Sequence, residues 1–315
     1  MTSISIWDGL NVAVVLPCYN EAQTIASVIA DFRNALPGAA IHVFDNNSSD
    51  ETAEVARAAG AHVITETRQG KGHVVRRMFA EVDADIYVMA DGDGTYDASA
   101  APKLVEALVT RRTDMVVGTR EGVTDDAGRR GHAVGNRLFN TLYRGMFGHD
   151  YTDIFSGYRV FTRRFAKSFP AVSGGFEIET EMSVHASQLM LPVAEIPCPY
   201  GVRPEGSASK LRTFRDGGRI LATFLMLLKE VRPAIFYGYV ACLAFGIAAA
   251  LGVPVIAEFL ATGLVPRLPT AVLAASTGII GTLALVCGLI LDSLTRARVE
   301  HTRLVYLSQP ALPLQ

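Results

Sequence analysis

The sequence predicts an α/β fold with a mainly parallel sheet, followed by an amphipathic helix and two helices that span a membrane. Short apolar runs alternate with helical segments over Val12–Gly118, and two long uncharged apolar stretches lie near the end of the chain. Of the 315 residues, 50% are apolar and 19% are charged, and the mean hydropathy is +0.26. The apolar excess falls in the last third of the chain, so we expect the preceding part to form a soluble domain.

Strands and helices alternate regularly from residue 12 onward. The apolar runs expected to form strands are Val12–Leu16, Ile41–Phe44, Ala61–Thr65, Ile86–Ala90 and Met115–Gly118. The segments expected to form helices between them are Ala22–Leu36, Thr52–Ala59, Gly72–Glu81 and Pro102–Thr110. This alternation indicates βαβ units and a parallel sheet that helices cover on both faces. Ligands of such sheets bind beyond the carboxyl ends of the strands.

The chain is less regular over Thr119–Tyr200. Glycine and arginine residues in Arg120–Gly131 predict a loop, and His132–Phe147 has the pattern of an amphipathic helix. The polar, Gly- and Ser-rich segment Tyr200–Lys210 predicts a second loop.

A basic amphipathic segment and two apolar segments follow. Over Leu211–Val231, apolar residues lie among several arginines, which is typical of a helix in a membrane interface. Ala234–Ala257 and Pro269–Leu291 contain no Asp, Glu, Lys or Arg, and each exceeds the roughly 20 residues that cross a bilayer. Basic residues precede the first span and follow the second, whereas the connection between the spans holds only Arg267. The positive-inside rule therefore predicts a hairpin in the cell membrane, with the soluble domain and both termini in the cytoplasm.

Charge, cysteine spacing and glycine pattern argue against several classes of protein. The net charge of −2 provides no basic excess for binding nucleic acid. The four cysteines lie far apart without metal-ligand spacing, and we expect them to be buried and reduced. The N-terminus lacks the pattern of a secretory signal peptide. No GxGxxG motif follows the first strand, which argues against a dinucleotide-dependent oxidoreductase.

Acidic and amide side chains follow three of the predicted strands, at Asn20-Glu21, Asp45–Asp50 and Asp91–Asp97. Because ligands bind at the carboxyl ends of parallel strands, we expect these clusters at the ligand site. Asp91 and Asp93 can both face one divalent cation, and ligation by oxygen alone suits Mg²⁺ or Mn²⁺. An isolated Asp-Gly-Asp turn is common in proteins and does not identify a site by itself.

Five short motifs occur in a fixed order along the chain. They are Val14–Glu21, Phe44–Thr52, Gly70-Lys71-Gly72, Asp91-Gly92-Asp93 and Thr152–Arg159. In this order and spacing they resemble the family 2 glycosyltransferases of the GT-A fold, over roughly residues 11–215. The most similar branch is the dolichyl-phosphate mannose synthase-like group of polyprenyl-phosphate glycosyltransferases, some of which carry a C-terminal transmembrane anchor.

This resemblance implies a site for a nucleotide-sugar donor. The residues implied in binding the donor are Pro17, Tyr19, Glu21, Asp45, Asn46, Gly92 and Arg120. Asn46 stands where the family usually has a second aspartate. Its amide can accept from a pyrimidine N3–H but can also donate, so the base stays open between UDP and GDP donors. Asp50 is expected to stabilise the turn before the helix that begins at Thr52.

The resemblance also implies that Asp91 and Asp93 hold Mg²⁺ or Mn²⁺ against the donor diphosphate. Many relatives have a glutamine two residues after the second aspartate, whereas this chain has Thr95. Whether Thr95 or Asp97 completes the set of ligands is left open.

Asp153 falls at the position of the family's catalytic carboxylate. Towards an acceptor that is already anionic, it would mainly orient the acceptor and the sugar, with weak help as a general base. Arg203, Ser207 and Lys210, in the loop before the amphipathic helix, are implied in binding the phosphate of a lipid acceptor. Glu179 and its acidic neighbours are assigned to a polar helix start, with contact to a sugar hydroxyl as the alternative.

The expected reaction is an inverting transfer of a hexose from a UDP- or GDP-sugar to undecaprenyl or dolichyl phosphate at the cytoplasmic face of the membrane. The alternatives are transfer to another glycolipid or polysaccharide, and an inactive membrane-tethered binding protein. The expected organisation is a catalytic domain (1–210), an interfacial helix (211–232), a transmembrane hairpin (233–295) and a cytoplasmic tail (296–315). Small residues at four-residue spacing over Ala274–Thr282 would allow spans to pack, including in a homo-oligomer.

Overall fold

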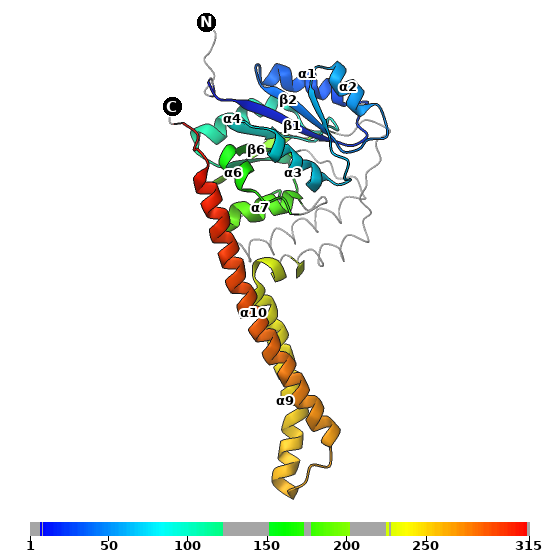
Figure 1. Cartoon of the computed structure of the whole chain (residues 1–315), viewed down its shortest axis with the longest axis vertical. Helices are drawn as coiled ribbons and strands as arrows, with labels where there is room; N and C mark the ends of the chain where they lie inside the picture. The colour runs from blue at the N-terminus through cyan, green and yellow to red at the C-terminus, as the bar shows by residue number, and fades with distance from the viewer. Residues whose placement is uncertain are drawn as a thin grey trace. The chain divides into compact units, whose positions relative to one another are not determined.

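The computed structural model describes residues 7, 9–121, 151–172, 178–201, 225–226 and 228–313. The chain forms two compact units. The first consists of Met1–Leu211 together with Thr302–Gln315, and the second consists of Arg212–His301. The first unit contains the sheet and the described motif residues, and the second contains most of two long apolar helices (Figure 1).

One seven-stranded sheet forms the centre of the first unit, in the order β3-β2-β1-β4-β6-β5-β7. Its strands are β1 (Val12–Cys18), β2 (Ala40–Asp45), β3 (His62–Thr65), β4 (Ile86–Met89), β5 (Met115–Glu121), β6 (Arg159–Thr162) and β7 (Val193–Pro199). Strands β1 to β4 form parallel pairs, and β5 is parallel to β7. Among the described strands, only β6 runs antiparallel to its neighbours, β4 and β5. The prediction of a mainly parallel α/β sheet is therefore confirmed.

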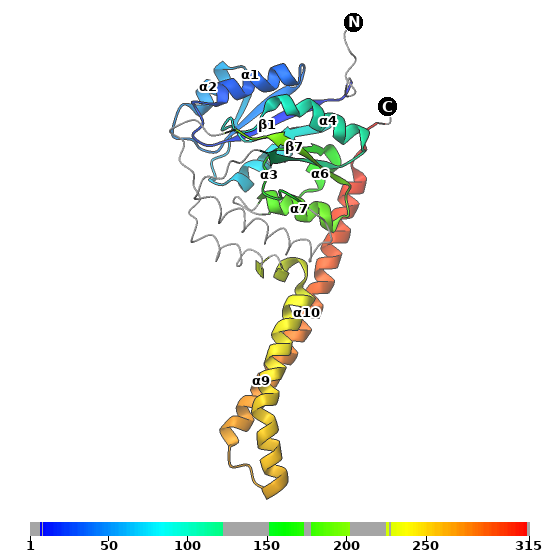
Figure 2. The same cartoon turned by 180° about the vertical axis from the view of Figure 1, so that it is seen from behind.

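Helices cover both faces of this sheet (Figures 1 and 2). In chain order they are α1 (Ile25–Ala35), α2 (Thr52–Ala58), α3 (Lys71–Glu81), α4 (Ala101–Thr110), α6 (Arg163–Ser168) and α7 (Ile178–Gln188), with a 3₁₀ turn η1 (Ala98–Ala100) before α4. Helices α1, α2 and α4 lie on one face of the sheet, and α3, α6 and α7 lie on the other. The helices predicted before residue 111 are all present, to within a few residues at their ends.

The apolar periodicity of α1 explains how it packs on the sheet. Its side chains Ile25, Val28, Ile29 and Phe32 recur at helical spacing and are buried in the core beneath it. Each apolar side chain of this size contributes roughly 1.5–3 kcal/mol when it is fully buried. Burial of this face holds the start of α1 in place, and with it the loop that carries the first motif.

Strands β6 and β7 and helix α6 were not predicted from the sequence, and of α7 only the polar start at Glu179 was. Strand β6 has only four residues and begins with a charged one, Arg159. Strand β7 contains Pro197 and Pro199, which usually argue against a strand but are tolerated at the edge of a sheet. The predicted loop at Arg120 is wrong at its start, because β5 continues to Glu121 and its pairing with β7 includes Arg120.

Several predictions fall on residues that the structure does not describe. They are the remainder of the loop to Gly131, the helix His132–Phe147, most of the loop Tyr200–Lys210 and most of the amphipathic helix Leu211–Val231. Near the end of that helix, residues 225–226 and 228–231 are described and are helical.

The second unit contains two helices long and apolar enough to cross a membrane, α9 (Pro233–Thr262) and α10 (Leu268–Ser308, whose end belongs to the first unit). Each helix includes one predicted span and extends beyond it. Small residues let the helices approach each other: a Cβ at Gly281 would lie 3.0 Å from the ring of Phe245, and one at Gly252 would lie 3.6 Å from Ala274. Only 17% of the most apolar stretch of each helix is buried. These helices are therefore not covered like the core helices of a soluble domain.

The end of α10 belongs to the first unit. Tyr306 donates from its hydroxyl to Asp114 Oδ2 at 2.8 Å, and the guanidinium of Arg164 lies over the Tyr306 ring, 5.2 Å from its centre. Arg164 also donates to the carbonyl of Gln309 at 3.1 Å. Tyr306 and Asp114, which are 192 positions apart in the sequence, thus pack together within the first unit.

Candidate active site

The loops that follow β1, β2 and β4 are joined by hydrogen bonds at the carboxyl edge of the sheet. Glu21 N donates to Thr52 Oγ1 at 2.8 Å, which links the loop after β1 to the start of α2. Thr24 Oγ1 donates to the carbonyl of Gly92 at 2.8 Å, which links the same loop to the turn after β4. The three polar clusters of the sequence therefore meet at one edge of the sheet.

The residues of the first motif lie on β1 and the loop after it. Pro17 pairs with Phe44 across the parallel strands β1 and β2. Tyr19 and Glu21 follow and are half-buried. This arrangement brings all three motif residues to the end of β2, where Asp45 lies.

Asp45 closes β2 and has only 4% of its surface exposed. Its Oδ2 accepts from Ser48 N at a long 3.4 Å. Its Oδ1 is buried and has no hydrogen-bond partner among the described residues. A buried carboxylate oxygen without a donor is unfavourable, so this position fits a ligand that supplies an N–H or a hydroxyl.

The side chain of Asn46 holds the loop between β3 and α3. Its Nδ2 donates to the carbonyls of Glu66 at 3.3 Å and Arg68 at 2.6 Å, and its Oδ1 accepts from Gly70 N at 2.8 Å. An aspartate could not donate to those two carbonyls. The amide in place of the usual aspartate thus fixes the start of α3, where Lys71 lies, and a bound base would have to use the second lone pair of Oδ1.

The Asp91-Gly92-Asp93 turn follows β4 and packs directly against β1. A Cβ at Gly92 would collide with Cys18 Sγ, so a side chain between the two aspartates would displace the buried Cys18. This close approach fixes the backbone from which both carboxylates project.

Asp93 is buried, and its Oδ1 accepts from Thr95 Oγ1 at 2.6 Å and from Thr95 N at 3.1 Å. Asp97 instead accepts from Ser99 N at 2.8 Å and begins the 3₁₀ turn η1. Of the two residues considered as further metal ligands, Thr95 therefore supports Asp93, and Asp97 serves as a helix cap.

Lys71 is the first residue of α3 and lies between two carboxylates. Its Nζ is 2.5 Å from Asp91 Oδ1 and 2.6 Å from Glu179 Oε1. Burial alone would lower the pKa of Lys71, but the charges of Asp91 and Glu179 outweigh it, so the pKa lies well above its ordinary value. Sequence reasoning placed Lys71 in a motif without a role and assigned Glu179 to a polar helix start. Glu179 does lie in the first turn of α7, but it is 5% exposed and ion-paired.

Asp91 and Asp93 fit a divalent cation only in part. Both are oxygen donors of the kind that Mg²⁺ and Mn²⁺ prefer. Among the described residues, however, no group of three His, Cys, Asp or Glu side chains could hold a metal ion. The pair therefore suits a cation that brings further oxygen ligands with it, such as water and a diphosphate.

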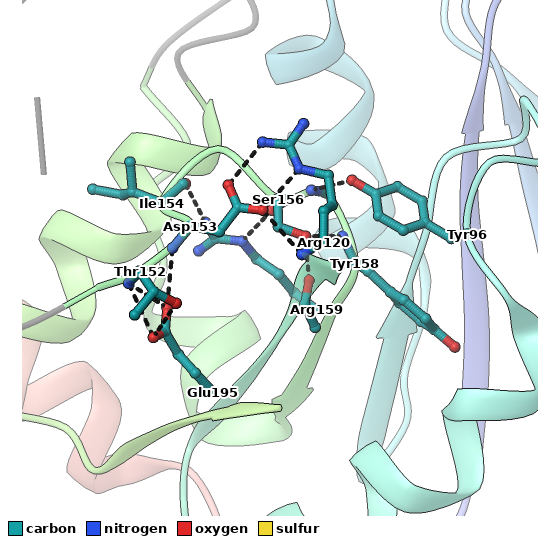
Figure 3. A network of polar contacts seen from close by, with 11 residues as sticks. Tyr96, Arg120, Thr152, Asp153, Ile154, Ser156, Tyr158, Arg159 and Glu195 are labelled. Atoms are coloured by element: carbon teal, nitrogen blue, oxygen red, sulfur yellow. Dashed lines mark hydrogen bonds and ion pairs between the residues drawn. The ribbon is translucent and has the colours of Figure 1, made fainter. Parts of the chain in front are cut away.

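Asp153 is gripped from two sides (Figure 3). Arg120 donates from Nε to Oδ2 and from Nη2 to Oδ1, each at 2.7 Å, and its guanidinium lies 5.6 Å from the centre of the Tyr200 ring. Burial would lower the pKa of Arg120, but the hydrogen bonds and the charge of Asp153 raise it above its ordinary value. On the other side, Glu195 of β7 accepts from Asp153 N at 3.4 Å, and from Thr152 N and Thr152 Oγ1 beside it. Sequence reasoning identified Arg120 and Asp153 separately, but neither their pairing nor Glu195.

Arg159 shapes the loop that carries Asp153 (Figure 3). Its side chain is fully buried and donates to the carbonyls of Ile154 at 2.6 Å and Ser156 at 2.8 Å, and to Ser183 Oγ at 3.0 Å. Ser156 Oγ in turn donates to the carbonyl of Gly118 at 2.5 Å, which ties the loop to β5. Arg159, the last residue of the motif, thus fixes the backbone of the loop that carries the rest of the motif.

Gly157 and Tyr96 connect this loop to the Asp-Gly-Asp turn. Gly157 N donates to Tyr96 Oη at 2.9 Å. A Cβ at Gly157 would lie 2.9 Å from Asp91 Oδ2 and 3.0 Å from Lys71 Nζ. The candidate metal-binding carboxylate and the loop of Asp153 are therefore in contact. The predicted acceptor residues Arg203, Ser207 and Lys210 lie outside the described residues.

The chain that carries the two-aspartate turn, the buried Asp45 and the Asp153–Arg120 pair is similar to several known proteins. Residues 13–169 match the family described as Glycosyl transferase family 2. Glycosyltransferase AglJ of Haloferax volcanii is 39% identical over 231 residues, which are 73% of this chain and 76% of that protein. The chain belongs to glycosyltransferase family 2. The dolichyl-phosphate hexose transferase of the same organism is 30% identical over 222 residues, covering 70% of this chain and 96% of that transferase.

Solved structures of a glucosyl-3-phosphoglycerate synthase share the fold. Glucosyl-3-phosphoglycerate synthase of Mycobacterium tuberculosis, solved with Mn²⁺, UDP and glucosyl-3-phosphoglycerate, is 26% identical with a TM-score of 0.56, over 71% of this chain and 80% of that one. Another structure of the same synthase holds Mg²⁺ and UDP, with the same TM-score and identity. The GT-A fold predicted from the motifs is confirmed, and the chain is a glycosyltransferase with relatives that are hexosyltransferases.

Proposed function

We propose that this glycosyltransferase moves a hexose from a UDP- or GDP-sugar to a polyprenyl phosphate, with inversion at the anomeric carbon. The observation that carries the proposal is the pairing of Asp153 with Arg120, whose guanidinium binds both carboxylate oxygens. A sugar hydroxyl is a weak nucleophile that needs a base to remove its proton. A carboxylate engaged by a guanidinium is poorly placed for that task, whereas a phosphate acceptor is already anionic. The dolichyl-phosphate hexose transferase of Haloferax volcanii acts, by its name, on an acceptor of this kind.

In the proposed reaction, an oxygen of the acceptor phosphate attacks C1 of the donor sugar. The bond between C1 and the diphosphate oxygen breaks, and its electron pair stays on the departing nucleoside diphosphate. No proton has to be removed from the acceptor. Asp153 and Arg120 orient the acceptor phosphate, and Lys71 offers a positive charge near the diphosphate side of the site.

Asp91 and Asp93 are the residues that would hold Mg²⁺ or Mn²⁺ with the donor. Such an ion, when bound, offsets the negative charge that develops on the diphosphate. Asp45, with its unpartnered buried oxygen, together with Pro17, Tyr19, Glu21 and Asn46, would line the nucleoside side of the donor. This assignment follows the resemblance of the motifs and the meeting of their loops at one edge of the sheet.

The lipid acceptor also fits the two apolar helices. We propose that α9 and α10 anchor the chain in the cell membrane, with the catalytic unit in the cytoplasm, because both are long and apolar enough to span it. Arg203, Ser207 and Lys210 would then bind the lipid phosphate, as the sequence predicts. The domain boundaries predicted from the sequence belong to the same proposal.

The test is a transfer assay with the full-length chain in membranes. A panel of radiolabelled UDP- and GDP-hexoses is offered with undecaprenyl phosphate, dolichyl phosphate or 3-phosphoglyceric acid, the last because the structural relative carries a phosphoglycerate product. We expect a mild-acid-labile glycosyl lipid, and its loss in Asp91→Asn. Transfer to phosphoglycerate in place of the lipids, or no glycosyl lipid with any donor, would refute the proposed acceptor.

A second experiment locates the acceptor site. Arg203→Ala and Lys210→Ala are assayed over a range of undecaprenyl phosphate concentrations, while donor affinity is measured separately. We expect a higher KM for the lipid and an unchanged donor affinity. Wild-type dependence on the lipid in both variants contradicts the assignment.

A further inference from the structure

Lys71 joins three segments of the chain that each carry part of the site. It begins α3, Asp91 lies in the turn after β4, and Glu179 lies in the first turn of α7. The ammonium group is within 2.6 Å of an oxygen from each carboxylate. The side chain of Lys71 is 9% exposed and that of Glu179 is 6% exposed, whereas that of Asp91 is 29% exposed. The ion pair with Glu179 is thus the more enclosed of the two.

This geometry has a consequence for any cation that approaches Asp91. One oxygen of Asp91 is already bound to the Lys71 ammonium group. A divalent cation must therefore displace the ammonium group or share Asp91 with it, and in either case the two positive charges come close together. Like charges repel strongly where solvent screening is weak. Glu179 can retain the ammonium group when it leaves Asp91, since it holds Lys71 from the other side. The lysine therefore has a second carboxylate partner and is not left as an unpaired buried charge.

A diphosphate changes this balance. Its oxygens are anionic, so they can accept from the Lys71 ammonium group and coordinate the cation at the same time. Asp91 is then released for the cation. Within the described part of the chain, no third His, Cys, Asp or Glu joins Asp91 and Asp93 in a group that could hold a metal ion. This acts in the same direction, because the cation needs oxygen ligands from elsewhere.

We propose that Lys71 is an internal counter-ion that makes binding of the divalent cation depend on the diphosphate of the donor, and that Glu179 is the positioning residue that holds Lys71 in this role. The inference rests on the proposed nucleotide-sugar donor but not on the identity of the acceptor. Thermodynamic linkage requires the dependence to be mutual: the cation strengthens nucleotide binding by the same factor. Without a nucleotide, Mg²⁺ or Mn²⁺ would then bind the site only weakly.

The experiment measures binding of Mn²⁺ to the full-length chain in detergent, without any turnover. Free Mn²⁺ is quantified by its electron paramagnetic resonance signal, with MnCl₂ alone and then with saturating UDP or GDP, corrected for the Mn²⁺–nucleotide complex in solution. The variants are Lys71→Met and the double variant Lys71→Met with Glu179→Gln. The double variant removes one positive and one negative charge, so its net charge equals that of the wild type. It also leaves no unpaired Glu179 carboxylate in the interior, which protects its folding.

In the wild type we expect weak binding of Mn²⁺ alone and much tighter binding with a nucleotide. Both variants should bind Mn²⁺ alone about tenfold more tightly than the wild type, and the enhancement by nucleotide should fall by a similar factor. Lys103→Met, which removes an exposed lysine of α4, is the control for loss of a positive charge and should behave as the wild type. Thermal unfolding of each variant identifies any that is not folded.

The outcomes separate this inference from the proposed function. If the double variant binds Mn²⁺ alone no more tightly than the wild type, the counter-ion role of Lys71 is wrong, whatever the acceptor. If only the single variant gains affinity, the effect is one of net charge and the specific ion pair is not its cause. If neither UDP nor GDP alters Mn²⁺ binding to the wild type, both this inference and the proposed donor fail.

Discussion

Arg120 donates two hydrogen bonds to the carboxylate of Asp153, from Nε and from Nη2, each at 2.7 Å. The backbone N of Arg120 adds a third at 3.2 Å. One residue is on a sheet strand and the other is on the loop before β6, so the pair joins the sheet to the motif loop. The Asp153 carboxylate thereby fixes the orientation of the Arg120 guanidinium. In turn, the guanidinium makes the carboxylate a weaker base.

Asp153→Asn and Arg120→Gln should each lower kcat, by about 10²-fold, because each removes one half of the pair that we propose to position the acceptor. If the two side chains act together, the double variant should be little slower than either single variant. Initial rates of glycosyl-lipid formation in a double-mutant cycle measure this. Effects that multiply in the double variant would show that the two residues act independently.

Gly157→Ala should impair activity more than stability. The added Cβ would lie 2.9 Å from Asp91 Oδ2 and 3.0 Å from Lys71 Nζ, so the ends of two site side chains must move. Such side-chain ends move at little cost, and we expect a stability loss of about 1 kcal/mol or less with at least a tenfold fall in kcat/KM. Gly238→Ala in α9, where a Cβ meets nothing within 4 Å, is the matched control. A normal rate in Gly157→Ala would show that this contact does not matter.

Asn46→Asp should destabilise the catalytic unit, although the family usually has an aspartate there. The substitution removes both hydrogens that Asn46 donates to the carbonyls of Glu66 and Arg68. We expect a loss of about 2 kcal/mol in the free energy of unfolding, measured with denaturant. Asn47→Asp is the control, since Asn47 is exposed and aspartate tolerates its positive φ of 56°. Equal stability of the two variants would contradict the structural role of Asn46.

The sequence was informative wherever the signal was local. Asp91 and Asp93 could be placed because a turn after a buried strand is visible in consecutive residues. Glu179 could not be paired with Lys71, because their approach depends on how α7 packs against α3, and no spacing records that. Strand β6 was not predicted because it is short and begins with the charged residue Arg159. The arginine is tolerated in the interior because the carbonyls of its own loop accept its hydrogens. Strand β7 was missed for a different reason: its prolines usually argue against a strand. They are tolerated here because β7 lies at the edge of the sheet.

The topology proposed for α9 and α10 predicts which positions an impermeant thiol reagent can reach. Val265→Cys lies in the connection between the helices and is exposed; in intact cells it should be labelled from outside. Ser308→Cys, exposed at the end of α10, should be labelled only after the cells are opened. The opposite pattern would reverse the proposed orientation.

The contact between Tyr306 and Asp114 also has a consequence for how the protein is made. The catalytic unit is assembled from two stretches of chain, and the second, Thr302–Gln315, emerges from the ribosome only after α9 and most of α10 have been synthesised. Domains generally fold as units during synthesis, beginning with the N-terminal part, but this one stays incomplete until residues 302–315 have been made. A chain shortened to end at residue 211 would lack Tyr306 and leave Asp114, which is 7% exposed, without its phenol partner. Removing the hydrophobic hairpin together with all that follows it is therefore not a neutral way to obtain a soluble enzyme. Deleting the hairpin alone, while residues 302–315 stay attached to the catalytic unit, would be the gentler change.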